Sequence, residues 1–217
     1  MSGLGPEAAA FLGALAANNN RDWFHAGKAA YERDLKGPAE AFSAVLADRL
    51  SAAHGMAHTP RIFRIARDVR FSKDKTPYNA HLHISFVPQV DGAPPAWLFG
   101  LEPKSLVLGV GIFAFEGAAL DRWREAVAGQ DGDELAGIVA RLEGQGVRFS
   151  EPELKRVPAP YDKDHPRGDL FRRKGLAAWL DGLPMETAYG EDGPANCVRE
   201  FARLEPVFAW LMRLNAR

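Results

Sequence analysis

The sequence predicts an α+β fold in which an antiparallel sheet of about four to six strands is covered by N-terminal and C-terminal helices. Two observations lead to this fold class. Apolar residues recur with a helical period over residues 6–54 and again over 117–144 and 194–214. Between these blocks, over residues 62–113, apolar residues alternate with a period of two, which is typical of half-buried strands.

The N-terminal block predicts two helical regions. The first covers residues 6–17, because Pro6 is a favourable first-turn residue and Phe11, Leu12 and Leu15 then share one face. The second covers about residues 23–54. Its hydrogen-bond ladder is expected to break at Gly37-Pro38, since proline has no N–H to continue it.

The central block predicts an antiparallel meander. Residues 62–71 are expected to form a strand whose apolar face carries Phe63, Ile65, Val69 and Phe71, with Arg67 among them. After a connection at 72–77, the strand 80–88 should pair with it as a hairpin, with Ile65, Val69, Leu82 and Ile84 on the buried side. Two further strands are expected at 96–102 and 105–113.

The C-terminal part predicts helices at about 117–128 and 131–144. The segment 146–192 is rich in proline, glycine and charge, so we expect loops there, with a short helix near 168–173 and a strand near 175–180. A last helix should cover about 194–214 and bend near Pro206.

Bulk composition predicts a single domain, residues 1–217, because no long linker interrupts the chain. The one cysteine, Cys197, cannot form an intramolecular disulfide and is expected to be a small core residue. No secretory signal and no run of about 18 to 20 apolar residues is found. These features predict a cytoplasmic protein that does not insert into a membrane.

Positive charge is segregated along the chain. The formal net charge is −1, yet residues 61–75 carry net +4 and residues 153–174 carry net +3. A pI near 6.6 argues against a general nucleic-acid binder, although nucleic acid stays open as a partner. If the fold brings the two segments together, they would focus a positive field in one place.

The polar face of the predicted hairpin is the first candidate site. It would present Arg64, Asp68 and Arg70 beside His81 and His83. Guanidinium forks suit phosphate or carboxylate, and a histidine can exchange a proton near neutral pH. Three interpretations stay open at this point: an anion site, cross-strand ion pairs on an exposed sheet, and a protein interface.

Arg67 and the histidines raise two narrower questions. Arg67 would lie on the apolar face, where a charge needs a carboxylate or a ligand as partner. His81 and His83 are spaced as zinc ligands can be, with His165 or Glu102 as a third. No further Cys or His cluster supports zinc, so no metal site is predicted.

Four stretches of this sequence resemble the domain of unknown function 2461 family. They are "FLGALAANNNRDWF" (11–24), "IFRIARDVRFSKDKTPYNAH" (62–81), "LKRVPAPYDKDHP" (154–166) and "LFRRKG" (170–175). The resemblance covers almost the whole chain and implies a single-domain, mostly bacterial α+β protein without an assigned activity. Ala66 departs from the larger, often aromatic residue expected at its position.

The leading hypothesis is a cleft that binds a compact anionic ligand, phosphorylated compounds included, with catalysis on that ligand left open. The alternative is a non-catalytic module that docks a protein or nucleic-acid partner through the same basic surface. The cofactor and the oligomeric state are unknown at this stage. The proton-handling candidates are Asp68, His81 and His165, and the ligand-binding candidates are Arg21, Arg64, Arg67, Arg70, Lys73, Lys75, Tyr78, Lys155 and Arg156.

Overall fold

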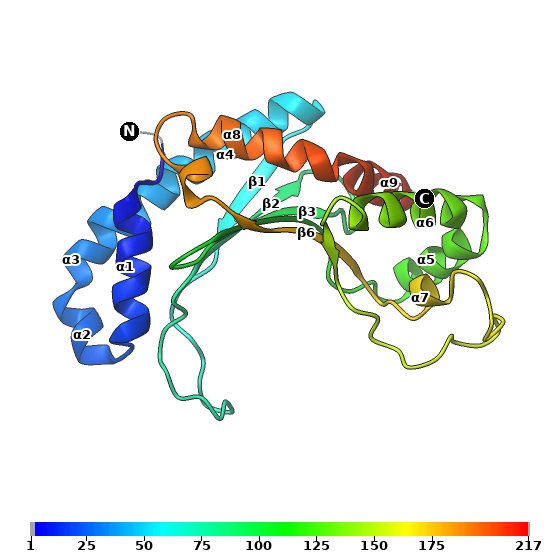
Figure 1. The fold of residues 1–217 in the computed structure, drawn as a ribbon, viewed down its shortest axis with the longest axis horizontal. Helices are drawn as coiled ribbons and strands as arrows, with labels where there is room; N and C mark the ends of the chain where they lie inside the picture. The colour runs from blue at the N-terminus through cyan, green and yellow to red at the C-terminus, as the bar shows by residue number, and fades with distance from the viewer. Residues whose placement is uncertain (1–2, 217) are drawn as a thin grey trace. The chain divides into compact units, whose positions relative to one another are not determined.

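A computed structural model of the chain describes residues 3–216, and its ribbon is shown in Figure 1. The structure is α+β, as predicted, with one six-stranded antiparallel sheet in the strand order β1-β2-β3-β4-β6-β5. The chain divides into two compact units. Unit 1 comprises Met1–Gln89, Leu98–Leu108 and Asp181–Phe201, and unit 2 comprises Val90–Trp97, Gly109–Leu180 and Ala202–Arg217. The prediction of a single domain over residues 1–217 stays a prediction.

The helices of unit 1 begin close to where the sequence placed them. Helix α1 (Pro6–Ala17) opens with proline in its first turn, and α2 (Arg21–Ala26) is capped by the side chain of Asn20, which accepts from the N–H of Trp23 at 2.9 Å. The helices of this unit that follow are α3 (Lys28–Ala30), η1 (Tyr31–Lys36), α4 (Gly37–His54) and α8 (Gly193–Phe201), with the 3₁₀ turn η2 (Met185–Ala188) between the last two.

The expected break at Gly37-Pro38 takes the form of a wider turn. Residues Tyr31–Lys36 are π-helical, and the N–H of Gly37 bonds to the carbonyl of Glu32. Because Pro38 offers no N–H, the chain adjusts its hydrogen bonding there and then continues as α4. The helix ends at His54 and is followed by Gly55, whose φ of 67° is the left-handed conformation that glycine adopts without strain.

The strands are β1 (His58–Ile62), β2 (Leu82–Pro88), β3 (Ala96–Leu101), β4 (Leu106–Ile112), β5 (Arg148–Phe149) and β6 (Leu176–Leu183). Strand β1 pairs antiparallel with β2, in a register that places Ile62 opposite Ile84. The prediction of a strand over 62–71 is wrong, because the strand ends at Ile62. The predicted antiparallel pairing is present, but it joins residues 58–62 to residues 84–88.

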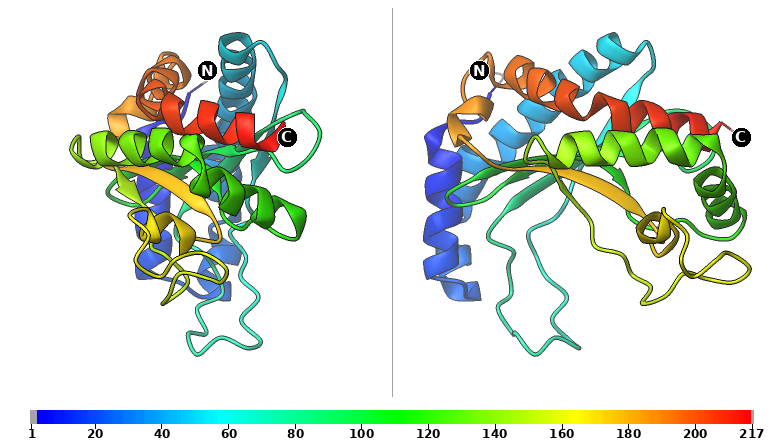
Figure 2. Two further views of the ribbon diagram at one scale, coloured as in Figure 1. Left: turned by 90° about the vertical axis from the view of Figure 1, so that its right-hand side faces the viewer. Right: turned by 45° about the vertical axis from the view of Figure 1, so that its right-hand side comes forward.

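The core of unit 1 lies between α4 and the sheet. The rings of Phe42 on α4 and Phe99 on β3 are 5.0 Å apart, and both side chains are fully buried. Leu82, Ile84 and Phe86 of β2 are buried, as their alternation predicted. Helices α4 and α8 lie side by side over one face of the sheet (Figures 1 and 2).

Unit 2 has its own aromatic core. Its elements besides strands are α5 (Ala118–Ala128), α6 (Gln130–Glu143), α7 (Gly168–Phe171), η3 (Ala202–Leu204) and α9 (Glu205–Asn215). Trp123 is buried between Phe115 at 4.9 Å and Trp210 at 5.6 Å, measured between ring centroids. Its indole N–H donates to the carbonyl of Leu170 at 3.3 Å. The last helix is interrupted near Pro206, as predicted.

Two further findings concern predictions from composition. Cys197 on α8 is fully buried, and desolvation raises the pKa of its thiol to about 12. Among residues 3–216, none of the helices combines the length and the apolar character needed to cross a bilayer.

Candidate functional site

The candidate site is built on a long loop, residues 63–81, which joins β1 to β2. Its two limbs run alongside each other, because the N–H of Arg67 donates to Pro77 O at 2.8 Å and the N–H of Asn79 donates to Ile65 O at 2.7 Å. The loop leaves the sheet on the side opposite α4 and α8 (Figures 1 and 2). Most of the basic segment 61–75 therefore lies in irregular but hydrogen-bonded backbone.

Asn19 attaches this loop to the N-terminal helices. Its side-chain amide donates to the carbonyl of Tyr78 at 2.8 Å and accepts from the N–H of the same residue at 3.1 Å. The rings of Phe24 and Tyr78 stack with their centroids 4.3 Å apart. The motif that contains Asn19 and the motif that contains Tyr78 are thus in direct contact. We call this contact the Asn19–Tyr78 joint.

A carboxylate and a hydroxyl hold Arg67 in place. Its Nη1 donates to Asp74 Oδ2 at 2.6 Å, to Thr76 O at 3.1 Å and also to the Thr76 hydroxyl. Asp74 also accepts a hydrogen bond from the N–H of Thr76. This bond has the largest effect on the pKa of Asp74 and the bond from Arg67 the second largest, and the pKa is lowered to about 2. Of the two partners predicted for Arg67, the structure therefore supplies the carboxylate.

A cleft of about 710 Å³ opens where the loop meets β1 and β2. We call it the basic cleft. Its volume lies in the range of small-molecule sites in proteins. All of its lining residues belong to unit 1, and they are Arg61, Ile62, Phe63, Arg64, Ala66, Arg67, Asp68, Asn79, His81 and His83.

The charges around the basic cleft favour anions. Arg64 is exposed and forms no hydrogen bond or ion pair with another residue of the described range 3–216. The one carboxylate in the lining, that of Asp68, is engaged by Arg70, with Nη2–Oδ2 at 2.6 Å and Nε–Oδ1 at 3.0 Å. This pairing, with a smaller contribution from the charge of Arg64, lowers the pKa of Asp68, so the carboxylate stays ionised while its charge is offset.

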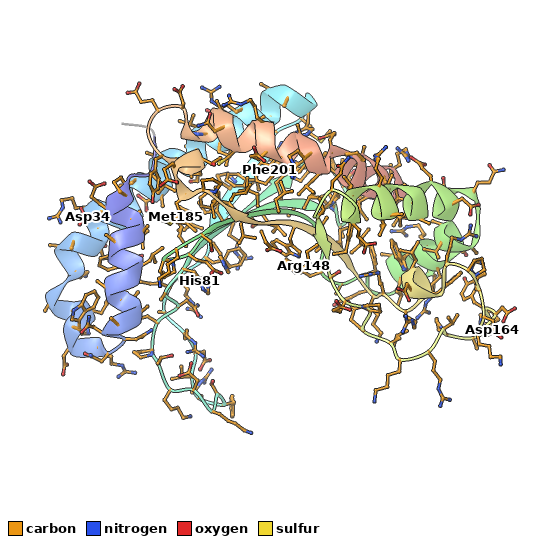
Figure 3. The ribbon with its side chains drawn as sticks, in the orientation of Figure 1. Asp34, His81, Arg148, Asp164, Met185 and Phe201 are labelled. Carbon is orange, nitrogen blue, oxygen red and sulfur yellow. The ribbon has the colours of Figure 1, made fainter. Side chains whose placement is uncertain are left out.

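Two stacked histidines complete the lining. The rings of His81 and His83 lie 3.7 Å apart with an interplanar angle of 17°. A Cβ on Gly100 of β3 would come within 3.2 Å of His83 Cδ2, so the missing side chain leaves room for this ring. His81 lies on the opposite side of the sheet from Phe201 of α8 (Figure 3).

Both imidazoles are neutral near pH 7. Desolvation, with a smaller contribution from His81, lowers the pKa of His83 to about 4. Desolvation also lowers the pKa of His81, against the opposing influence of Glu102. A neutral imidazole has one donor and one acceptor, so either ring can hydrogen-bond an anion and can exchange a proton with it.

Five predicted ligand residues of unit 1 lie elsewhere on the loop or its supports. Arg70 pairs with Asp68, and Lys75 Nζ donates to the carbonyl of Val69 at 3.0 Å, which stabilises the loop tip. Tyr78 belongs to the joint with Asn19. Lys73 and, on α2, Arg21 are exposed.

The remaining candidates belong to unit 2. Lys155 and Arg156 are exposed, whereas His165 is half-buried with its ring against Phe171 at 4.8 Å. His165 Nδ1 accepts from the N–H of Arg167 at 3.0 Å, so it helps to form the turn before α7. That these residues meet the basic segment 61–75 stays a prediction.

The sequence did not single out Arg61, Phe63 or Asn79 as site residues. Phe63 was expected on a buried strand face, but it is 44% exposed and lines the basic cleft. Phe71, also expected on that face, is 96% exposed on the loop tip. Both errors have one origin, because regular strand pairing ends at Ile62. Beyond it the two limbs keep only separate backbone hydrogen bonds, and Ile65 is buried as predicted while Phe63 and Phe71 are exposed.

A metal site finds no support among residues 3–216. No three or more Cys, His, Asp or Glu side chains of this range come together as a group that could hold an ion. Glu102, weighed above as a third ligand for His81 and His83, influences His81 only electrostatically.

Comparison with known proteins identifies one family. The family model described as "Conserved hypothetical protein (DUF2461)" matches residues 7–210. No curated protein and no solved structure matches the chain.

Proposed function

This chain belongs to the DUF2461 family, and from that premise we propose that it binds a compact anion, such as a phosphate group, in the basic cleft. The observation that carries the proposal is the guanidinium of Arg64, which lines the cleft without an ion pair among the described residues. A second guanidinium, that of Arg61, lines the same cleft. Two arginine forks in one cleft suit the oxygens of a phosphate or a carboxylate.

The surroundings of these arginines support an anion over a cation. Asp68 is neutralised by Arg70, so the cleft has no carboxylate free to repel the ligand. Asn79 and the two histidines add uncharged hydrogen-bonding groups. Arg67 also lines the cleft, but Asp74 offsets its charge and its Nη1 is committed to Asp74 and Thr76.

The proposal also includes catalysis on the bound anion, and this part depends on His81. A proton acceptor must lie beside the ligand and be unprotonated at working pH, and a histidine with a lowered pKa meets the second condition. Asp68 is the weaker candidate, because its pairing with Arg70 makes the carboxylate a poor base. His165 belongs to unit 2 and takes no part in the cleft described here.

Thermal unfolding with inorganic phosphate tests the proposal. A ligand that binds only the native state stabilises it by RT ln(1 + [L]/Kd), about 2.7 kcal/mol at one hundred times Kd, which raises Tm by about 5–10 °C for a chain of this size. Chloride at matched ionic strength separates binding from screening. We expect the rise for phosphate alone.

Variants locate the effect. Arg64→Met should remove most of the rise, whereas Arg49→Met should keep it, because Arg49 is an exposed arginine on α4 that does not line the cleft. The two changes alter the net charge equally. An equal response of both variants to phosphate, or no rise in the wild-type protein, would reject the basic cleft as an anion site.

A further inference from the structure

Phe63 gives the basic cleft an apolar wall that a bare anion does not need. The side chain is 44% exposed, although a large apolar residue gains free energy by leaving water. Its backbone is anchored, because the N–H of Phe63 donates to the carbonyl of His83 at 2.9 Å. Phe63 is therefore attached beside the start of β2, and it lines the cleft together with Arg61 and Arg64.

Arg61 lies over this ring. The guanidinium carbon of Arg61 is 5.1 Å from the ring centroid of Phe63, within the range of a cation–π contact. The pair therefore offers a flat aromatic surface and a positive charge at one place. Proteins that bind nucleotides of single-stranded nucleic acids use this combination, with a base on the ring and a phosphate near the cation.

Asn79 adds a group that can recognise the edge of a ring. Its backbone N–H is used within the loop, in the bond to Ile65 O. Asn79 lines the cleft, and its side-chain amide forms no hydrogen bond with any other residue between 3 and 216. An amide of this kind can donate to and accept from one heterocycle at the same time.

We infer that the ligand of the basic cleft joins an anionic group to a flat heterocycle, as a nucleoside monophosphate does, with the heterocycle on Phe63 and the phosphate at Arg61 and Arg64. This inference rests on the proposed anion site and adds the chemical class of its ligand. The volume of about 710 Å³ lies within the range of pockets that take ligands of this size.

Four small molecules test the inference by calorimetry: inorganic phosphate, ribose 5-phosphate, adenosine and adenosine monophosphate. We expect the monophosphate to bind at least about tenfold more tightly than ribose 5-phosphate, because stacking of a base on an aromatic side chain contributes on that order. Phe63→Leu should reduce this ratio to nearly one, and the remaining response to inorganic phosphate should still depend on Arg64.

Phe71→Leu is the matched control. Phe71 also lies near an arginine, with the guanidinium carbon of Arg70 5.9 Å from its ring centroid, but it lies on the loop tip and does not line the cleft. The affinity for adenosine monophosphate should stay within twofold of wild type in this variant. The Tm of the free Phe63→Leu protein, expected within about 2 °C of wild type, shows that the variant folds.

The outcomes separate the two proposals. Equal affinities for ribose 5-phosphate and adenosine monophosphate, with the phosphate response still dependent on Arg64, would overturn the ligand class and keep the anion site. Absence of binding by all four compounds would overturn both. Tighter binding of a single-stranded oligonucleotide, lost in Phe71→Leu and kept in Phe63→Leu, would overturn the cleft in favour of docking at the loop tip.

Discussion

Arg67 lines the basic cleft, but its main partners are residues of the loop and not a ligand. A cation in a half-buried position needs an opposite charge or several acceptors, and Arg67 has Asp74 and Thr76 on a single guanidinium nitrogen. Asp74 also accepts from the N–H of Thr76, so the three residues close the loop on themselves. Arg67 therefore has a structural role in the loop whether or not an anion is bound.

The pKa of Asp74 reports whether the ion pair with Arg67 forms. Arg67→Met removes one of three hydrogen-bonding contributions that stabilise the ionised carboxylate, so we expect that pKa to rise from about 2. It should remain below the ordinary value of 3.8, because the N–H of Thr76, the larger influence, is retained. Carboxyl-carbon NMR titration gives the value directly.

Arg70→Met is the control for that titration, since Arg70 pairs with Asp68 and not with Asp74. In this variant the pKa of Asp68 should rise and that of Asp74 should stay where it is. An unchanged pKa of Asp74 in Arg67→Met would mean that the ion pair does not form in solution.

At the scale of elements, the decisive feature is the joint between the α1–α2 connection and the long loop. Asn19 forms both of its hydrogen bonds with the backbone of Tyr78, 59 residues away in sequence, much as a strand would. Tyr78 is followed directly by Asn79, which lines the basic cleft. The joint thus sets the position of one cleft wall.

Asn19→Ala should weaken both stability and ligand binding. Loss of two partly buried hydrogen bonds is expected to cost about 1–2 kcal/mol, or about 2–8 °C in Tm for a chain of this length. Asn20→Ala is the comparison, because it removes the N-cap of α2, a loss of about 1 kcal/mol, and leaves the loop attached. Phosphate affinity, measured by calorimetry, should fall in the first variant and stay in the second.

Equal phosphate affinities in the two variants would show that the joint stabilises the fold without shaping the cleft.

The limits of prediction from sequence are also clearest at this scale. Helices and the strands β2 to β4 could be predicted, because their apolar periodicity reflects burial against a continuous core. The segment 63–71 could not, since extended loop backbone and a strand show the same alternation when partner strands are unknown. Whether the side chain of Phe63 faces the core or the cleft depends on where the regular pairing of β1 with β2 ends. That end point depends on contacts between residues distant in sequence.

The candidate site was predicted in part for the same reason. Arg64, Asp68 and His81 were chosen for their charge and chemistry, and these side chains do line one cleft. Asn79 gave no such signal, because an asparagine beside a tyrosine and an alanine is ordinary in a loop. Its importance depends on the Asn19–Tyr78 joint, which local sequence does not reveal.

Across the whole molecule, the stacked histidines link stability to pH. In the unfolded chain His83 binds a proton with the ordinary pKa of 6.5, but in the folded chain its pKa is about 4. Between these values the unfolded state binds more protons, so the free energy of unfolding should decrease as the pH falls from about 6.5 to about 4. His81, whose pKa is lowered in the same direction, adds to this effect.

Denaturant unfolding at pH 7.5, 5.5 and 4.5 measures this dependence, and His83→Gln should reduce its slope. Asp74 acts in a separate and lower window, since its depressed pKa gives stability above about 3.8 that is lost as the pH falls towards about 2. A slope between pH 6.5 and 4 that is the same in His83→Gln and wild type would assign the pH dependence to other groups.

The burial of Cys197 makes its thiol a natural probe of local unfolding in unit 1. It is the one thiol in the sequence, it is fully buried on α8, and its pKa of about 12 keeps it protonated in the folded state. A thiol reagent attacks the thiolate, so labelling has to wait until α8 separates from its neighbours in unit 1. The labelling rate of Cys197 in the wild-type chain therefore reports how often unit 1 opens locally. No engineered cysteine is needed for this measurement.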